Sequence, residues 1–300
     1  MTWEHCSTAL PTPTGRLWAR LWSSGFQRRI LWRSAWRTRC GGTLSRIASA
    51  AEGGSFFLPP IFVRVRSPEQ LLRLAEEYAP FSSILRGFIL PKFFLENCGA
   101  YLAAIRSIGR TEEYFYMPVF ESAAMIPPQT RREALTEVRA QLDTVSGSIL
   151  NIRVGGNDLS HAFGLRRPAN RTIYDLRPVA DILIDIVAAF GTQYVVSGPV
   201  WEYYSGEGWE EGLRREMELD LLNGFTGKTV IHPNQIPVVN EMLRVSRQDY
   251  ADARAILNWD TGGGSLVSAS EDGGRMNEYN THSRWARRIL LRAERYGVRA

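Results

Sequence analysis

Short apolar runs of strand length alternate with helix-length segments through most of the chain. Six such runs lie between residues 61 and 232, and each of the five intervals between them is long enough for an amphipathic helix. Strands that alternate with helices pair in parallel through right-handed crossover connections. The alternation therefore predicts an α/β fold built on a parallel sheet. The predicted strands are residues 61–65, 86–92, 114–120, 149–156, 193–197 and 227–232.

The number of strands relates this sheet to a barrel. A (β/α)₈ barrel closes with eight strands, whereas six are predicted in this chain. The two missing strands would precede residue 61. We therefore predict a fold of the (β/α)₈ TIM-barrel type that lacks the first two strands, with residues 58–259 as a partial barrel domain. Residues 260–300 comprise a predicted flexible Gly/Ser-rich linker and a basic amphipathic helix over 280–296 that docks on the barrel or on a neighbouring subunit.

Residues 1–57 differ from the rest of the chain. They hold five of the nine tryptophans, and residues 1–50 hold eight arginines against one acidic residue. The net charge of the chain is +5, so the +7 of this segment leaves −2 for the remainder. Three interpretations stay open: an organellar targeting peptide, a basic segment at a membrane surface, or a wrongly started or out-of-frame reading. We predict that residues 1–57 are disordered or spurious.

A carboxylate follows each of two neighbouring predicted strands at the point where the strand ends. Glu121 comes directly after residues 114–120, and Asp158 follows residues 149–156. The carboxyl ends of parallel strands meet at one end of a barrel, and carboxylate oxygens are preferred ligands of Mg²⁺. The spacing therefore predicts a divalent-cation site on Glu121 and Asp158. In the alternative interpretation, Glu121 is an ordinary acid at a helix start and Asp158 is an N-cap.

Composition bears on compartment and partners. No apolar run approaches the length of a membrane span. The three cysteines lack the spacing of a metal or redox motif, which favours a cytoplasmic protein without disulfides. The Arg/Trp-rich start contains no recognisable nucleic-acid-binding module. We expect a small-molecule substrate, and neither nucleic acid nor membrane as a partner.

Two of the 36 Lys and Arg residues are lysines, Lys92 and Lys228. In a chain that otherwise uses arginine, this choice suggests that an ammonium group is needed at both positions. Lys92 is predicted to point into the mouth of the barrel as a substrate or phosphate contact, and a Schiff-base role is chemically possible. Lys228 begins the last predicted strand, where it packs or pairs with an acid.

Several motifs occur in a characteristic order. They are Val63-Arg64-Val65, Ile89-Leu90-Pro91-Lys92, Pro118-Val119-Phe120-Glu121, Gly155-Gly156-Asn157-Asp158-Leu159, and the run Gly227-Lys228-Thr229-Val230-Ile231-His232-Pro233-Asn234-Gln235-Ile236. The ordered set resembles the HpcH/HpaI aldolase and citrate lyase β-subunit superfamily. It is most similar to the branch called carbon–carbon bond lyases of the TIM-barrel fold. The resemblance covers about residues 58–299.

This resemblance implies roles for particular residues. The metal ligands of the family fall on Glu121 and Asp158, and its substrate-contacting arginine falls on Arg64. Lys92 and His232 are the other candidate catalytic residues, because both stand where strands end at the catalytic face of a barrel. The predicted substrate-binding residues are Arg64, Gly155, Gly156 and Asn157.

The implied function is a Mg²⁺-dependent carbon–carbon lyase or aldolase. It would act on a small carboxylate- or phosphate-bearing metabolite or a thioester, through an enolate stabilised by the cation and an arginine. Members of the superfamily carry an Asp-Leu-Glu-Asp motif before the arginine strand, and residues 1–57 contain none. The alternative is therefore a truncated, non-catalytic barrel homologue with an assembly role. Barrel enzymes of this kind usually associate, so we expect a homo-oligomer.

Overall fold

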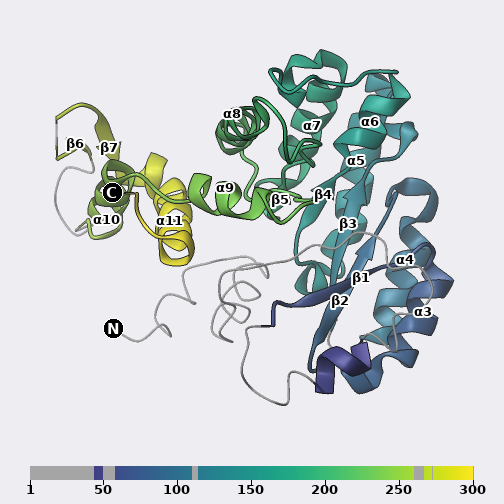
Figure 1. Ribbon diagram of the computed structural model, residues 1–300. Helices are drawn as coiled ribbons and strands as arrows, with labels where there is room; N and C mark the ends of the chain where they lie inside the picture. Colours follow the sequence, from purple (N-terminus) through teal and green to yellow (C-terminus); the bar gives the residue numbers. More distant parts are fainter. Residues whose placement is uncertain (1–43, 50–57, 110–113, 260–266, 272, 300) are drawn as a thin grey trace. The chain divides into compact units, whose positions relative to one another are not determined.

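The computed structural model describes residues 44–49, 58–109, 114–259, 267–271 and 273–299 (Figure 1). It forms two compact units that divide after Gln235. Most of the Arg/Trp-rich start and the first part of the predicted linker lie outside the described residues. The domain boundaries predicted at residues 57/58 and 259/260 stay predictions. Within the described ranges, no helix is both long enough and apolar enough to span a membrane.

The first unit contains a five-stranded parallel sheet in which every strand pairs with its neighbours in the sequence, in the order β1-β2-β3-β4-β5. The strands are β1 (Ile61–Arg64), β2 (Leu85–Leu90), β3 (Phe115–Phe120), β4 (Ile152–Val154) and β5 (Val196–Ser197). The α/β prediction and five of its six strands are confirmed. The prediction of an extended sixth strand over 227–232 is wrong, because this segment pairs with the chain after β5 through a single parallel bridge, between Gly198 and Lys228.

Helices follow the strands in alternation. The longer ones are α3 (Pro68–Glu77), α4 (Leu95–Ile108), α5 (Pro128–Asp143), α7 (Arg177–Phe190) and α8 (Trp209–Leu222), with α6 (Gly156–Ala162) as a short helix after β4. The Ser67 side chain caps α3 by accepting a hydrogen bond from the backbone N–H of Gln70, with Pro68 as the first helical residue. Helices α3, α4, α5 and α7 pack in that order along the sheet (Figure 1).

The two faces of the sheet bury different side chains, because successive residues of a strand point to opposite faces. On the helix-covered face, Phe88, Leu90, Tyr116 and Phe120 join the main apolar core. On the other face, Ile89, Met117, Val119 and Leu150 form a smaller cluster. Any charged residue in register with this second set therefore lies on the face that the helices leave uncovered.

Residues 44–49 form a helix that belongs to the first unit. Leu44 is buried in the main core, and Ile47 and Ala48 pack against that core. The first unit therefore includes residues that precede the domain boundary predicted at residue 58. The rest of the Arg/Trp-rich segment lies outside the described part of the chain.

The second unit consists mainly of α10 (Arg247–Leu257) and α11 (Tyr279–Tyr296), with α9 (Gln235–Met242) at its start. The predicted C-terminal helix is confirmed, and it packs on α10 through Ala253, Ile256, Ala286, Ile289 and Ala293. The flexible linker stays a prediction, and the structure describes residues 267–271 and 273–277 of it. Here β6 (Val267–Ala269) and β7 (Met276–Glu278) form an antiparallel pair, and the Arg275 guanidinium pairs with Asp249 and Asp252 on α10.

Candidate active site

Charged side chains gather on the sheet face that the helices leave uncovered. Arg64, Glu121 and Arg153 alternate with core residues of β1, β3 and β4, so all three share the face of Ile89 and Val119. They line a cavity of about 200 Å³ at the carboxyl ends of the strands. The remaining lining residues include Val154, Gly155, Gly156, Asn157, Asp158, Val200, Thr229, Val230 and Ile231.

Glu121 is the most constrained acid of this cavity. It is 6% exposed. Its Oε1 atom accepts hydrogen bonds from Arg64 Nη2 at 2.8 Å and from the backbone N–H of Lys92 at 3.1 Å. Burial raises the pKa of the Glu121 carboxyl, Arg64 opposes this shift, and the charge of Asp158 raises the pKa further. The two carboxylates predicted to share a cation therefore lie within electrostatic range of each other.

The two glycines after β4 are required by contacts within the protein. A Cβ atom on Gly155 would lie 2.3 Å from both Cβ and Oε2 of Glu121. A Cβ atom on Gly156 would lie 2.5 Å from the side chain of Ile173 and 2.8 Å from that of Pro199. Both glycines are predicted substrate-binding residues, and this role stays a prediction. The structure adds a more immediate cause, because Gly155 makes room for the Glu121 carboxylate.

Asp158 lies in the first turn of α6 and is exposed. The N-cap of α6 is Gly155, so the alternative interpretation of Asp158 as an N-cap is wrong. Glu121 is likewise not a solvated acid at a helix start, since its carboxylate is buried against Arg64. Among the residues that the structure describes, no three His, Cys, Asp or Glu side chains form a group that would hold a metal ion by themselves.

Arg153 is a cavity residue that the sequence analysis did not identify. It is 9% exposed, and its Nη2 atom donates to Oγ1 of Thr229 at 3.0 Å. Burial lowers the pKa of Arg153 to about 10, the charge of Arg64 lowers it as well, and Glu121 opposes both. The available sequence signal was an arginine between two apolar residues of a short buried strand, Ile152 and Val154.

The side chains of Lys92 and His232 lie outside the lining of this cavity. Lys92 has a left-handed backbone with φ of 50°; its N–H contacts Glu121 while its side chain is exposed. The His232 ring stacks on Tyr204 with 4.4 Å between centroids, and its Nδ1 atom accepts a hydrogen bond from the N–H of Asn234. Neither side chain is among those that line the 200 Å³ cavity, and their catalytic roles stay predictions.

Lys228 pairs with acids, as one of its two predicted roles required. Its Nζ atom donates to Glu216 Oε1 and to Asp220 Oδ2, each at 2.7 Å, and all three side chains are at most 1% exposed. Arg167 lies 2.9 Å from Glu216 on the other side, and the Tyr174 hydroxyl donates to Asp220 at 2.7 Å. This buried ionic cluster fixes the position of Lys228, the residue before Thr229. It thereby fixes the segment whose Thr229 hydroxyl accepts a hydrogen bond from Arg153.

Gln235, near the end of the motif that begins at Gly227, has a structural role. Its Oε1 atom accepts from the backbone N–H of Ile231 at 2.9 Å. Its Nε2 atom donates to the carbonyls of Trp201 and Tyr203 at 2.9 and 2.8 Å. A fully buried amide thus joins the loop after β5 to the segment that closes the cavity.

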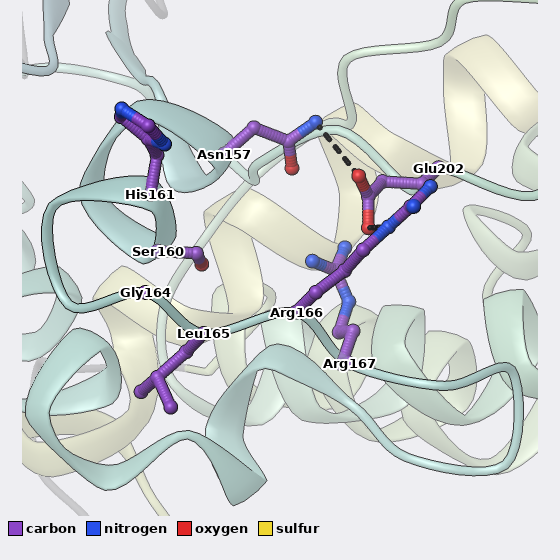
Figure 2. Close-up of a pocket in the computed structure, with 8 residues that line it drawn as sticks. All are labelled: Asn157, Ser160, His161, Gly164, Leu165, Arg166, Arg167 and Glu202. Carbon is purple, nitrogen blue, oxygen red and sulfur yellow. Dashed lines mark hydrogen bonds and ion pairs between the residues drawn. The ribbon is translucent and has the colours of Figure 1, made fainter.

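A second cavity, of about 340 Å³, lies beside the first. Figure 2 shows its lining residues, among which Asn157 and Arg166 both reach toward Glu202. Asn157 Nδ2 donates to Glu202 Oε1 at 3.4 Å, and Arg166 Nε lies 3.6 Å from Oε2. Asn157 also lines the first cavity, so this predicted substrate-binding residue stands between the two.

The fold and the site together define a class of protein. A parallel sheet wound in sequence order, with acids and arginines at the carboxyl ends of its strands, is the arrangement of TIM-barrel proteins. The sequence profile of the family described as C–C bond lyase of the TIM-barrel fold matches residues 37–298, and the chain belongs to this family. The matched region begins before residue 58, where the resemblance of the motifs begins.

Solved structures give the same fold. A citrate lyase from Burkholderia xenovorans LB400 is 16% identical, with a TM-score of 0.62 over 95% of this chain and 88% of that one. The protein CitE from Mycobacterium tuberculosis, solved with magnesium, acetoacetate and coenzyme A, is 19% identical, with a TM-score of 0.51 over 82% of each chain. No curated protein sequence matches the chain. The predicted TIM-barrel-type fold and the predicted membership of the carbon–carbon bond lyase branch are confirmed.

Proposed function

We propose that this protein is a carbon–carbon bond lyase that uses Mg²⁺ held by Glu121 and Asp158. The supporting observation is the buried Glu121 carboxylate, which is paired with Arg64 and lies within electrostatic range of Asp158 at the carboxyl ends of the strands. Membership of the C–C bond lyase family supports the reaction class. The magnesium in the CitE structure from M. tuberculosis supports the choice of cation.

The residues present fit this cation. Glu121 and Asp158 both line the cavity, and Glu121 Oε1 accepts hydrogen bonds from Arg64 and the Lys92 N–H while Oε2 lies against Gly155. Asp158 is exposed and adds a second carboxylate. Mg²⁺ is typically bound by one or two carboxylates and keeps several waters, so it needs no third acid. A structural zinc site would need four His or Cys ligands. When bound, Mg²⁺ would polarise a substrate oxygen as a Lewis acid.

Arg64 has the chemistry to stabilise the charge that develops on the substrate. When the bond between the α and β carbons of a β-hydroxy carbonyl compound breaks, the hydroxyl gives its proton to a base or to water and becomes the carbonyl of one fragment, and the other fragment is left as an enolate with negative charge on its oxygen. A fixed guanidinium beside that oxygen lowers the energy of the anion. The contact with Glu121 holds one end of the Arg64 fork at 2.8 Å, and the half-exposed side chain lines the cavity. Glu121 thus positions the arginine in addition to its proposed role as a ligand.

The cavity favours a small anionic substrate. Its volume of about 200 Å³ lies below the range of about 300–1,000 Å³ that is typical of sites for drug-sized ligands. Two of its four charged lining residues are arginines, which bind carboxyl groups through parallel hydrogen bonds. We therefore propose a carboxylate-bearing metabolite, or its thioester, as the substrate.

Calorimetric titration with MgCl₂ tests the cation site. We expect wild-type protein to bind one Mg²⁺, and Glu121→Gln and Asp158→Asn each to weaken binding at least about tenfold, since each removes a charged ligand. The matched control is Asp181→Asn, on the exposed side of α7, where the carboxylate pairs with Arg177. Unchanged Mg²⁺ affinity in Glu121→Gln, or an equal loss in the control, would refute the assignment.

A second assay separates an enzyme from a non-catalytic homologue. Cleavage of a panel of hydroxy acids and 4-hydroxy-2-oxo acids is followed by NMR with Mg²⁺ and with EDTA. We expect turnover of at least one compound that depends on Mg²⁺ and is lost in Arg64→Met. Metal binding without turnover across the panel would favour the non-catalytic alternative.

A further inference from the structure

The turn between β2 and α4 contains a backbone conformation that lysine rarely adopts. Strand β2 ends at Leu90, and the chain rejoins the sheet where the N–H of Phe93 donates to the carbonyl of Val119 at 3.0 Å. Between these points Lys92 has a φ of 50°, and within the described ranges it is the one residue other than glycine with a positive φ. The Cβ atom makes this left-handed region unfavourable for lysine. Such a conformation persists only where surrounding contacts impose it.

This turn lies directly against the Glu121 carboxylate. The backbone N–H of Lys92 donates to Glu121 Oε1 at 3.1 Å, the same oxygen that Arg64 contacts at 2.8 Å. The side chain of Lys92 is exposed. Backbone N–H groups that donate to a carboxylate stabilise its charged form and fix its orientation. The conformation of the turn therefore determines how firmly Glu121 is held.

The side chain of Asn97, in the first turn of α4, holds this conformation from the other side. Its Nδ2 atom donates to the carbonyl of Lys92 at 2.9 Å, and its Oδ1 atom accepts from the N–H of Phe94 at 3.1 Å. Both contacts together require an amide, because a carboxylate only accepts and a cationic side chain only donates. Phe94 is the N-cap of α4, so one contact caps the helix. The other contact joins the left-handed residue to the helix.

We propose that Asn97 is a positioning residue for Glu121 that acts through the backbone of Lys92. Asn97 holds the Lys92 carbonyl, and the turn so fixed keeps the Lys92 N–H on Glu121 Oε1. Glu96 supports the same arrangement, because its Oε1 atom accepts from Ser122 Oγ at 2.7 Å. The first turn of α4 thus also holds the residue after Glu121. The inference rests on the proposed function where it assigns Mg²⁺ to Glu121.

The variant Asn97→Asp separates this role from helix capping. Its carboxylate still accepts from the Phe94 N–H, and an acid in the first turn suits the helix dipole. Stability in urea unfolding should therefore stay close to that of wild type. The carboxylate cannot donate to the Lys92 carbonyl, so the hold on the turn is lost. The added negative charge by itself would favour a cation, so a loss of Mg²⁺ affinity cannot come from it.

Hydrogen exchange followed by NMR in EDTA measures the turn, and calorimetry with MgCl₂ measures the site. In Asn97→Asp we expect the Lys92 amide to exchange at least about tenfold faster while the Phe94 amide keeps its protection, because only the first contact is lost. Mg²⁺ affinity should fall about tenfold, as is typical when a residue that orients a metal ligand is changed. The matched control is Asn280→Asp, an exposed position in the first turn of α11, which should change neither quantity.

A second background tests the left-handed conformation itself. Glycine adopts a positive φ without strain, so the turn of a Lys92→Gly protein depends less on Asn97. In this background we expect Asn97→Asp to lower Mg²⁺ affinity only about threefold, and the difference between the two losses measures the coupling of the two residues.

Three results would overturn the proposal. They are an unchanged exchange rate of the Lys92 amide in Asn97→Asp, faster exchange with unchanged Mg²⁺ affinity, and an equal loss of affinity in both backgrounds. A wild-type protein that binds no Mg²⁺ would instead refute the proposed function. Hydrogen exchange in EDTA would then still decide whether Asn97 holds the Lys92 N–H.

Discussion

Replacing Lys228 with methionine tests the buried ionic cluster that fixes the cavity wall. The change keeps the length and apolar stem of the side chain but removes the ammonium group that donates to Glu216 and Asp220 at 2.7 Å each. Loss of one partner from a buried ion pair costs about 3–5 kcal/mol. We expect the lower end, about 3 kcal/mol, because Arg167 remains 2.9 Å from Glu216 and Asp220 can become neutral by taking up a proton.

The protonation of Asp220 gives this prediction a pH signature. Burial raises the pKa of Asp220 to about 6, and Lys228 is the largest factor that opposes the rise. Without Lys228 the pKa rises further, so the variant holds the proton at pH 7 while wild type has largely lost it. The deficit in the free energy of unfolding should therefore shrink by about 1 kcal/mol between pH 7 and pH 6. Below pH 6 the deficit changes less with pH, because Asp220 becomes protonated in wild type as well.

Urea unfolding followed by circular dichroism at pH 7, 6 and 5 measures both quantities. The other lysine, Lys92, supplies the matched control, because its side chain is exposed. We expect Lys92→Met to change the free energy of unfolding by less than about 0.5 kcal/mol. Equal stability of the two variants, or a Lys228→Met deficit that grows as the pH falls, would refute the reasoning.

Three further predictions concern the site and its supports. Gly155→Ala should weaken Mg²⁺ binding, measured by calorimetry, at least about tenfold with little change in circular dichroism. The reason is that the new Cβ would lie 2.3 Å from the Glu121 carboxylate oxygen Oε2 and displace it. Unchanged Mg²⁺ affinity would contradict this reasoning. In wild type, Asp220 has a raised pKa, so its contribution to stability is present below about pH 4 and is lost as the pH rises through about 6. Relative to Asp220→Asn, wild type should therefore gain about 2.4 kcal/mol between pH 7 and pH 4 in urea unfolding, and a difference of the opposite sign would exclude the assignment. Gln235→Leu should cost about 2 kcal/mol in the same assay, because it leaves the buried carbonyl of Trp201 and the partly buried carbonyl of Tyr203 and N–H of Ile231 without the amide that pairs them. A neutral effect would show that water replaces the amide.

The order of elements was determined by local sequence patterns. The alternation of apolar runs predicted a helix in the interval between residues 92 and 114, and α4 (Leu95–Ile108) lies there. The start of α3 is local in the same way, because the Ser67 cap joins residues three apart in the chain. The placement of Glu121 and Asp158 near each other also followed from sequence, since parallel strands bring their carboxyl ends to one edge.

Interactions between distant residues were decided by the tertiary structure alone. Arg153 meets Thr229 across 76 positions, and no local pattern indicates that partner. The choice of acids for Lys228 depends on how α8 lies against the last segment of the sheet. That segment was expected to be an extended strand, yet it forms one bridge, and the buried side chains of Lys228 and Gln235 make its other contacts with distant parts of the chain. Local periodicity thus determined which elements form, whereas packing between distant elements determined which charges share the cavity.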